Sequence, residues 1–330
     1  MNANHRLEWI DSLKAVAIFW IYLGHFGDNA KQLYPFVFSF HVPLFFFISG
    51  IFFKKCSSLY DFNIIAIKSS KRILIPYFTF SLISLIFFSL YYNYDFPQVR
   101  ELASQIIPGI RNHIFAASLW FLPCLFVIIM MHSFIQLIIK NRHLIFITCI
   151  AIFFFSSIMK IGIQPKLFFN IDSALRYVAY YALGAYLSCY IKEPQEYNSN
   201  LTSKITSYII CSLSMSLFIY VYFYGVASIY NGIKNEYLKI LASFIITAAL
   251  FIPNITIAKR IKIKQVILIG QSTLVLCGTE QMLKTFIYSS FKMIGLKVYL
   301  HNSIDTILYT FLCFFVAYFT TIKIYNKISN

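Results

Sequence analysis

Ten long apolar runs, spaced along the whole chain, constrain this sequence more than any other feature. Each run is long enough, or nearly so, to cross the roughly 30 Å hydrocarbon core of a bilayer as a helix. Only helices and closed barrels satisfy the backbone in lipid, and barrel strands would alternate polar and apolar residues. The sequence therefore predicts an all-α polytopic helical bundle, with spans at residues 9–26, 36–53, 74–92, 118–139, 144–160, 174–191, 205–224, 238–257, 265–288 and 303–323.

The composition also favours a membrane protein. The sequence is 59% hydrophobic, 19% aromatic and 12% charged, whereas a soluble domain carries about twice that charged fraction. No linker, low-complexity tract or soluble extension separates the runs, so we expect one membrane-embedded domain over residues 1–330. Polar residues interrupt the first run, which also lacks a small-residue cleavage site, so we expect no cleavable signal peptide.

The net charge of +16 indicates membrane orientation, because the basic residues gather in alternate loops, and it predicts no nucleic-acid partner. With the N-terminus inside, sixteen basic residues are cytoplasmic: Arg6, Lys54, Lys55, Lys68, Lys71, Arg72, Lys140, Arg142, Lys192, Lys204, Lys259, Arg260, Lys262, Lys264, Lys323 and Lys327. Eight lie on the opposite side: Lys31, Arg100, Arg111, Lys160, Lys166, Lys234, Lys292 and Lys297. This bias predicts an even number of spans with both chain ends in the cytoplasm.

Ionisable residues interrupt the first run, where they are costly and are by default functional-site candidates. Lys14 and His25 are eleven residues apart, close to three helical turns or about 16 Å, so a helix places both on nearly one face. This spacing predicts an imidazole deep in the bilayer. Asp11 precedes Lys14 by three residues, which predicts an i,i+3 ion pair.

Five motifs occur along the chain in a fixed order. They are DSLK at 11–14 with GH at 24–25, FHVPLFFFISG at 40–50, RILIPY at 72–77, LWFLP at 119–123 and GQSTL at 270–274. The ordered set resembles the acyltransferase-3 family of membrane O-acyltransferases, in its fucose-acetylase-like branch. The resemblance covers essentially the whole chain.

The resemblance implies a multi-pass O-acetyltransferase of the bacterial inner membrane. Such an enzyme moves an acetyl group from acetyl-CoA, its co-substrate, to a sugar hydroxyl of a cell-surface polysaccharide or its lipid-linked precursor. His25 is then the expected catalytic base, because an imidazole titrates near neutrality and can accept a hydroxyl proton. Lys14 and Asp11 complete the expected catalytic set, with Lys14 on the donor side and Asp11 holding it in place. Direct transfer and an acyl-histidine intermediate both stay open. We expect no metal, because the seven cysteines show neither CxxC pairs nor metal-ligand spacing.

The donor and the acceptor require further contacts. Lys71 and Arg72, at the cytoplasmic start of the third run, are candidates for binding the phosphates of coenzyme A, although they could be positive-inside anchors. His41 precedes Pro43, which frees a backbone carbonyl one turn back, so His41 either satisfies that carbonyl or binds the acceptor. Trp120 is either a membrane-interface aromatic residue or a stacking platform for a sugar.

Glu280 interrupts the ninth run, and Lys284 follows one turn later. It forms an ion pair with Lys284, acts as the partner of a base, or binds acceptor hydroxyls. The resembling pattern commonly has histidine at this position, so no role is carried over from it.

Two other classes of membrane protein share this composition. A polysaccharide flippase would place several cations along a path through many helices, and a polymerase would carry a large external loop. Here the membrane-depth charges concentrate in the first and ninth runs, and the loop at 93–117 is short, which favours an enzyme. A sensor or scaffold would leave Lys14 and His25 without a role.

Overall fold

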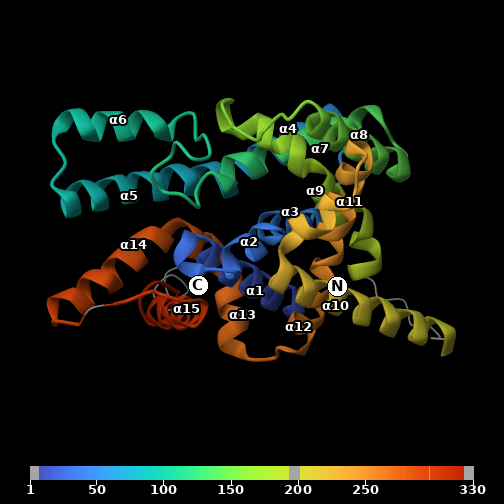
Figure 1. Ribbon diagram of the computed structural model, residues 1–330. Helices are drawn as coiled ribbons and strands as arrows, with labels where there is room; N and C mark the ends of the chain where they lie inside the picture. The colour runs from blue at the N-terminus through green and yellow to red at the C-terminus, as the bar shows by residue number, and fades with distance from the viewer. Residues whose placement is uncertain (1–6, 193–200, 297, 323–330) are drawn as a thin grey trace. The chain divides into compact units, whose positions relative to one another are not determined.

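The computed structural model describes residues 7–192, 201–296 and 298–322, and this part of the chain is helical without any strand. The all-α prediction is therefore confirmed. Its helices are α1 (Glu8–Gly24), η1 (Gly27–Ala30), α2 (Leu33–Phe38), α3 (His41–Ile51), α4 (Leu59–Ser69), η2 (Ser70–Leu74), α5 (Ile75–Tyr92), α6 (Phe96–Ile106), α7 (Phe121–Ile138), α8 (Arg142–Ile158), η3 (Phe168–Asn170), α9 (Ile171–Lys192), α10 (Leu201–Asn231), α11 (Glu236–Ala249), α12 (Phe251–Arg260), α13 (Lys264–Gln271), α14 (Thr273–Met293), α15 (Ser303–Ala317) and η4 (Tyr318–Ile322) (Figure 1).

The chain forms two compact units, each built from segments that are distant in the sequence. Unit 1 comprises residues 1–48, 189–273 and 298–330, and unit 2 comprises residues 49–188 and 274–297. Helix α1 is central to unit 1, where it packs against α2, α12, α13 and α15 (Figure 1). In unit 2, α7 packs against α4, η2, η3 and α8, while α6 folds back along α5 (Figure 1).

Polar contacts inside unit 1 fix α1 against α12 and the loop that follows it. The indole Nε1 of Trp20 donates to Asn254 Oδ1 at 2.7 Å, and Ser12 Oγ donates to the Ile261 carbonyl at 3.1 Å. Trp20 also meets the edges of Phe36 and Phe40, with ring centroids 5.8 and 5.7 Å away. Because transmembrane helices gain little from apolar contact in lipid, such hydrogen bonds and close packing hold them together.

Large apolar side chains cover the outside of the helices. Leu90, Tyr208 and Leu213 are 74%, 76% and 66% exposed, and only 11% of the apolar window in α10 is buried. A soluble protein rarely exposes so much continuous apolar surface, whereas a helix in lipid does. The chain is therefore a multi-pass membrane protein.

Within the described residues, six helical segments are long and apolar enough to cross a membrane, or seven if the broken pair α13–α14 is one span. Three of the ten predicted runs are outside this set. They fall in α1 and α8, which have 17 residues each, and in α9, which carries Asp172 and Arg176. Seventeen residues is the lower limit for a span, and charged residues lower mean hydropathy, so the total of ten stays a prediction.

The residues between the second and third predicted spans, 54–73, are largely helical. Helix α4 begins at Leu59 because Ser58 and Asp61 form a capping box, and α4, η2 and α5 continue as one apolar segment over Leu59–Tyr92. The short pattern Ser-x-x-Asp was the signal for this earlier start. A second capping box, made by Asp95 and Gln98, starts α6 within the loop expected at 93–117.

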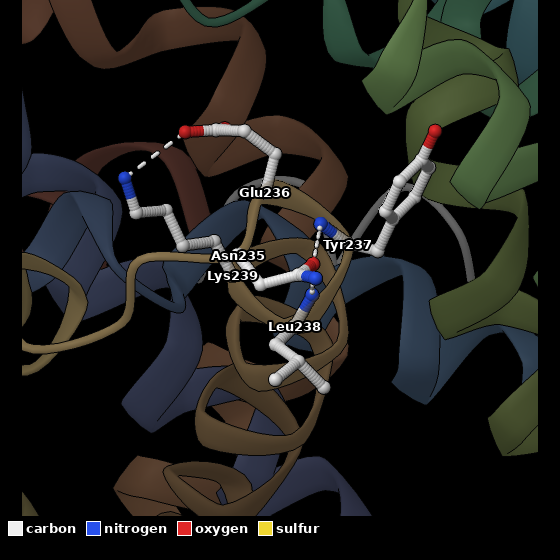
Figure 2. A network of polar contacts seen from close by, with 5 residues as sticks. All are labelled: Asn235, Glu236, Tyr237, Leu238 and Lys239. Carbon is white, nitrogen blue, oxygen red and sulfur yellow. Dashed lines mark hydrogen bonds and ion pairs between the residues drawn. The ribbon is translucent and has the colours of Figure 1, made fainter.

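Figure 2 shows the N-terminus of α11, where the side chain of Asn235 caps the helix. Asn235 Oδ1 accepts hydrogen bonds from the backbone N–H groups of Tyr237 at 2.9 Å and Leu238 at 3.2 Å. In the first turn, Lys239 Nζ lies 3.0 Å from Glu236 Oε1 (Figure 2). An acidic residue in the first turn also suits the positive end of the helix dipole.

The predicted orientation stays a prediction. Both chain ends, residues 1–6 and 323–330, lie outside the described residues. So do Arg6, Lys297, Lys323 and Lys327, and the side chain of Lys204 is also outside them.

Candidate functional site

The predicted ion pair at the start of α1 is confirmed. Lys14 Nζ lies 3.2 Å from Asp11 Oδ1, and the side chains of Lys14 and Asp11 are 27% and 4% exposed. The Glu236–Lys239 pair has the same i,i+3 spacing, but its side chains are 77% and 35% exposed (Figure 2). A surface pair of that kind contributes about 0–1 kcal/mol, whereas a buried carboxylate depends on its cation. Asp11 therefore fixes the position of the Lys14 ammonium.

Helix α13 packs against α1 (Figure 1). Gly270 packs so closely on α1 that a Cβ atom there would overlap the Asp11 carbonyl oxygen. Gln271 Nε2 then donates to Asp11 Oδ2 at 3.5 Å. The GQSTL motif had pointed to this segment, but the sequence contained no signal for its position beside Asp11.

His25 lies at the end of α1, and its expected place inside the helix is wrong. Helix α1 ends at Gly24, and His25 is the C-cap residue, whose N–H donates to the Ile21 carbonyl at 3.1 Å. The helix stops here because Gly27 adopts a φ of +56° and turns the chain into η1. The imidazole is partly exposed, at the opposite end of α1 from Asp11 and Lys14.

His41 is buried at the first position of α3. Its Nδ1 lies 2.8 Å from the Val37 carbonyl oxygen. The carbonyl that Pro43 leaves without a helical donor belongs to Ser39, and Thr247 Oγ1 donates to it at 3.1 Å. The first of the two roles considered for His41 is therefore wrong, since Thr247 satisfies that carbonyl. Acceptor binding by His41 stays a prediction.

Lys71 and Arg72 lie on the π-helical turn η2 and are exposed, together with Lys68 one turn earlier. The turn is closed by the Ile75 N–H, which donates to the Ser70 carbonyl. A π turn inserts one extra residue and often marks a functional segment. The three cations thus lie within a continuous helix rather than at its opening, and their role in binding the donor stays a prediction.

Trp120 is the N-cap residue of α7 and is 7% exposed. The guanidinium of Arg111 lies over its ring, with Cζ 5.2 Å from the ring centroid. Asn170 Nδ2 donates to the Trp120 carbonyl at 3.3 Å and to the Gly109 carbonyl at 2.6 Å. The indole is therefore already stacked with a cation, and sugar binding by Trp120 stays a prediction.

The predicted Glu280–Lys284 pair is confirmed. Lys284 Nζ lies 2.8 Å from Glu280 Oε1, and the side chains of Glu280 and Lys284 are 0% and 11% exposed. One turn before Glu280, Ser118 Oγ donates to the Cys277 carbonyl at 2.8 Å and fixes α14 in unit 2. This pair is more enclosed than the Asp11–Lys14 pair.

The structure adds a buried imidazole that had not been considered. His132, inside α7, is 3% exposed, and its Nδ1 lies 3.1 Å from Gln136 Nε2. Gln136 Oε1 accepts from the Cys56 N–H at 3.1 Å, and its Nε2 donates to the Lys54 carbonyl at 3.2 Å. Because Gln136 Nε2 donates in this contact, His132 Nδ1 accepts the hydrogen bond. The ring proton of His132 therefore lies on its own Nε2. A histidine inside the run at 118–139 was a sufficient signal for this site.

Unit 1 therefore brings together Asp11 and Lys14 and adds Gln271, with His25 and His41 elsewhere in the same unit. Unit 2 contains Lys71, Arg72, Trp120 and Glu280. In unit 1, α1 carries the fixed ammonium of Lys14 and the partly exposed imidazole of His25. Those are the groups that a hydroxyl acylation needs: a cation for an anionic or polarised oxygen, and a base for the proton.

The fold and these side chains define a polytopic helical membrane protein with polar groups suited to catalysis. The model of the acyltransferase domain family matches residues 7–326. The chain therefore belongs to the acyltransferase-3 family and is a membrane acyltransferase. No curated protein and no solved structure matches the chain.

Proposed function

We propose that this protein is an O-acetyltransferase of the bacterial inner membrane. Its donor is acetyl-CoA, and its acceptor is a sugar hydroxyl of a cell-surface polysaccharide or its lipid-linked precursor. The observation that carries the proposal is the Asp11–Lys14 pair on the helix that ends at His25, in a chain that belongs to this family. Family membership also sets aside a flippase or polymerase.

The reaction makes one ester bond and breaks one thioester bond. His25 takes the proton of the sugar hydroxyl, and the oxygen attacks the acetyl carbonyl carbon. The thioester then breaks, and the thiolate of coenzyme A leaves and takes up a proton. In the two-step alternative, the His25 imidazole attacks the thioester and takes the acetyl group while the thiol of coenzyme A leaves. The sugar hydroxyl then takes the acetyl group, and its proton returns to the imidazole.

The cations have separate tasks in this proposal. Lys71 and Arg72 attract the phosphates of coenzyme A, because charge-assisted hydrogen bonds to phosphate are stronger than neutral ones. Lys14, at the opposite end of α1 from His25, binds another anionic oxygen of the donor, and Asp11 keeps its ammonium in place. His41, Trp120 and Glu280 are candidates for contacts with the acceptor.

The test compares the surface glycan of cells with and without the protein by mass spectrometry, and follows labelled acetyl groups from acetyl-CoA in isolated membranes. We expect a mass difference of one acetyl group per glycan repeat, and label in the glycan fraction. An unchanged glycan, with label in no glycan or lipid fraction, would contradict the proposal. Label in a lipid without sugar would keep the acyltransferase but change its acceptor.

A further inference from the structure

The break between α13 and α14 lies beside the Asp11–Lys14 pair. Helix α13 ends at Gln271, Ser272 follows with φ −101° and ψ 18°, and α14 begins at Thr273. The Ser272 N–H donates to the carbonyls of Leu268 at 3.1 Å and Ile269 at 3.0 Å. A broken apolar helix places irregular backbone at membrane depth, which is tolerated where it lines a cavity or is enclosed in protein.

The contact of α13 with α1 places this break next to Asp11. Because Gly270 has no Cβ, the backbone of α13 can touch the Asp11 carbonyl. The next residue, Gln271, donates a hydrogen bond to Asp11 Oδ2, while the Lys14 ammonium contacts Asp11 Oδ1. Both oxygens of the buried carboxylate therefore have a partner, and the carboxylate can rotate only if it gives up one of them.

Ser272 is the unsatisfied group at the break. Its side chain is 2% exposed, and its Oγ has no hydrogen-bond partner within the part of the chain that the structure describes. Other hydroxyls in these helices bond to the carbonyl one turn back, as Thr279 does with Val275 at 2.8 Å. A buried hydroxyl without a partner costs stability, and a ligand oxygen at the break would remove that cost.

We propose that the α13–α14 break is part of the acyl-transfer site, which rests on the function proposed above. Ser272 binds an uncharged oxygen of the donor or the acceptor at the Lys14 end of α1, away from the thioester and the reacting hydroxyl. Gln271 is a positioning residue that holds Asp11, and through Asp11 it holds the Lys14 ammonium.

The first experiment separates ligand binding by Ser272 from a structural role. Ser272→Ala is purified in detergent, and its melting temperature and its transfer from acetyl-CoA to a lipid-linked glycan extract are measured. Removal of an unsatisfied hydroxyl leaves the melting temperature unchanged or raises it, whereas transfer falls by roughly two- to tenfold, as expected for one lost hydrogen bond. A higher KM for acetyl-CoA identifies the donor as the ligand, and a higher KM for the extract identifies the acceptor.

The matched control is Ser173→Ala. Ser173 is also buried, its Oγ also lacks a partner in the described structure, and it lies outside the proposed site. Its transfer rate is expected to equal that of the wild type. If Ser272→Ala retains full transfer, or if its melting temperature falls together with its activity, Ser272 does not bind a ligand.

The second experiment tests the positioning role without relying on activity. An acetylating reagent modifies lysine amines, and mass spectrometry compares Lys14 with Lys239, whose exposed ion pair is the internal reference. Asp11→Asn is expected to increase labelling of Lys14, because the ammonium loses its carboxylate. Adding Gln271→Glu returns a carboxylate to the same contact, so labelling of Lys14 falls again in the double variant.

The double variant also recovers part of the transfer activity that Asp11→Asn loses. Labelling of Lys14 that stays high in the double variant would rule out Gln271 as a partner of this pair. If the wild type transfers no acetyl group at all, the proposed function fails, whereas the labelling still decides whether Gln271 holds the pair.

Discussion

A carboxylate inside an apolar helix stays charged only when cations or hydrogen-bond donors compensate it. Asp11 and Glu280 both meet this condition through a lysine within one helical turn, at 3.2 and 2.8 Å. The two ammonium groups differ, because the Lys14 side chain is 27% exposed and that of Lys284 is 11% exposed. The Lys14 ammonium is therefore the more accessible to a ligand, whereas the Glu280 pair suits a structural role.

The first prediction at this scale concerns the imidazole. His25→Gln is expected to lose about 10²–10⁴-fold in transfer rate, because glutamine cannot act as a general base at neutral pH. Acetylation of the glycan is measured together with the amount of protein in the membrane. Since His25 lies at the end of α1 and is partly exposed, the variant should fold normally. Wild-type acetylation in this variant would exclude His25 as the base.

The second prediction separates a structural role of Glu280 from a role in the reaction. Glu280→Leu alone leaves the Lys284 cation buried and should cost about 3–5 kcal/mol of stability. Glu280→Leu with Lys284→Met removes both charges and should recover the melting temperature and the activity, if the pair is only structural. A stable double variant that transfers no acetyl group would instead assign Glu280 a role in the reaction, as the partner of a base or as a contact with the acceptor. Thermal unfolding and transfer assays on both variants distinguish these outcomes.

At the scale of the elements, breaks in the helices determine where polar groups can gather. The π turn η2 interrupts the segment Leu59–Tyr92 where Lys71 and Arg72 lie, and Ser272 interrupts the pair α13–α14 beside Asp11. Gly27 ends α1 at His25 in a similar way. Regular helices use their backbone donors and acceptors internally, so the irregular turns are where side chains and backbone remain available for ligands.

The prediction for η2 is a loss of donor affinity in Arg72→Ala. Removing one charge-assisted hydrogen bond to a phosphate should cost about 1.5–3 kcal/mol, or roughly ten- to a hundredfold in the KM for acetyl-CoA, with kcat little changed. The matched control is Arg100→Ala, since Arg100 is an exposed arginine on α6. An unchanged KM in Arg72→Ala would make Arg72 an anchor for membrane orientation only.

At the scale of the whole molecule, the basic residues predict the orientation of every span. Single cysteines near residues 60, 198 and 262 should react with a membrane-impermeant reagent only from the cytoplasmic side, and those near 100 and 230 only from the outside. Residue 198 lies outside the described residues, whereas Tyr60 is 73% exposed. Cys189 and Cys211 are exposed and must be replaced first. Labelling of residue 60 from the outside would reverse the orientation and move the proposed donor site to the other face.

The fold class, the family and both ion pairs could be predicted from the residues alone. Long apolar runs can cross a bilayer only as helices, and i,i+3 and i,i+4 spacings bring Asp11 to Lys14 and Glu280 to Lys284 on any helix. These features depend on residues close together in the chain. The end of α1 at Gly24 and the start of α4 at Leu59 were also local, but a single glycine and a capping box are weak signals beside an apolar run.

Contacts between residues that are distant in the chain could not be predicted in this way. Gln271 reaches Asp11 across 260 positions in the sequence, and Thr247 satisfies the Ser39 carbonyl across 208. Neither contact leaves a periodic or compositional signal, because each depends on how two helices pack against each other. The burial of Ser272 could not be predicted from the sequence either. Ser272 belongs to a motif that is visible in the sequence, but its hydroxyl is buried without a partner in the described structure because of how the surrounding helices pack.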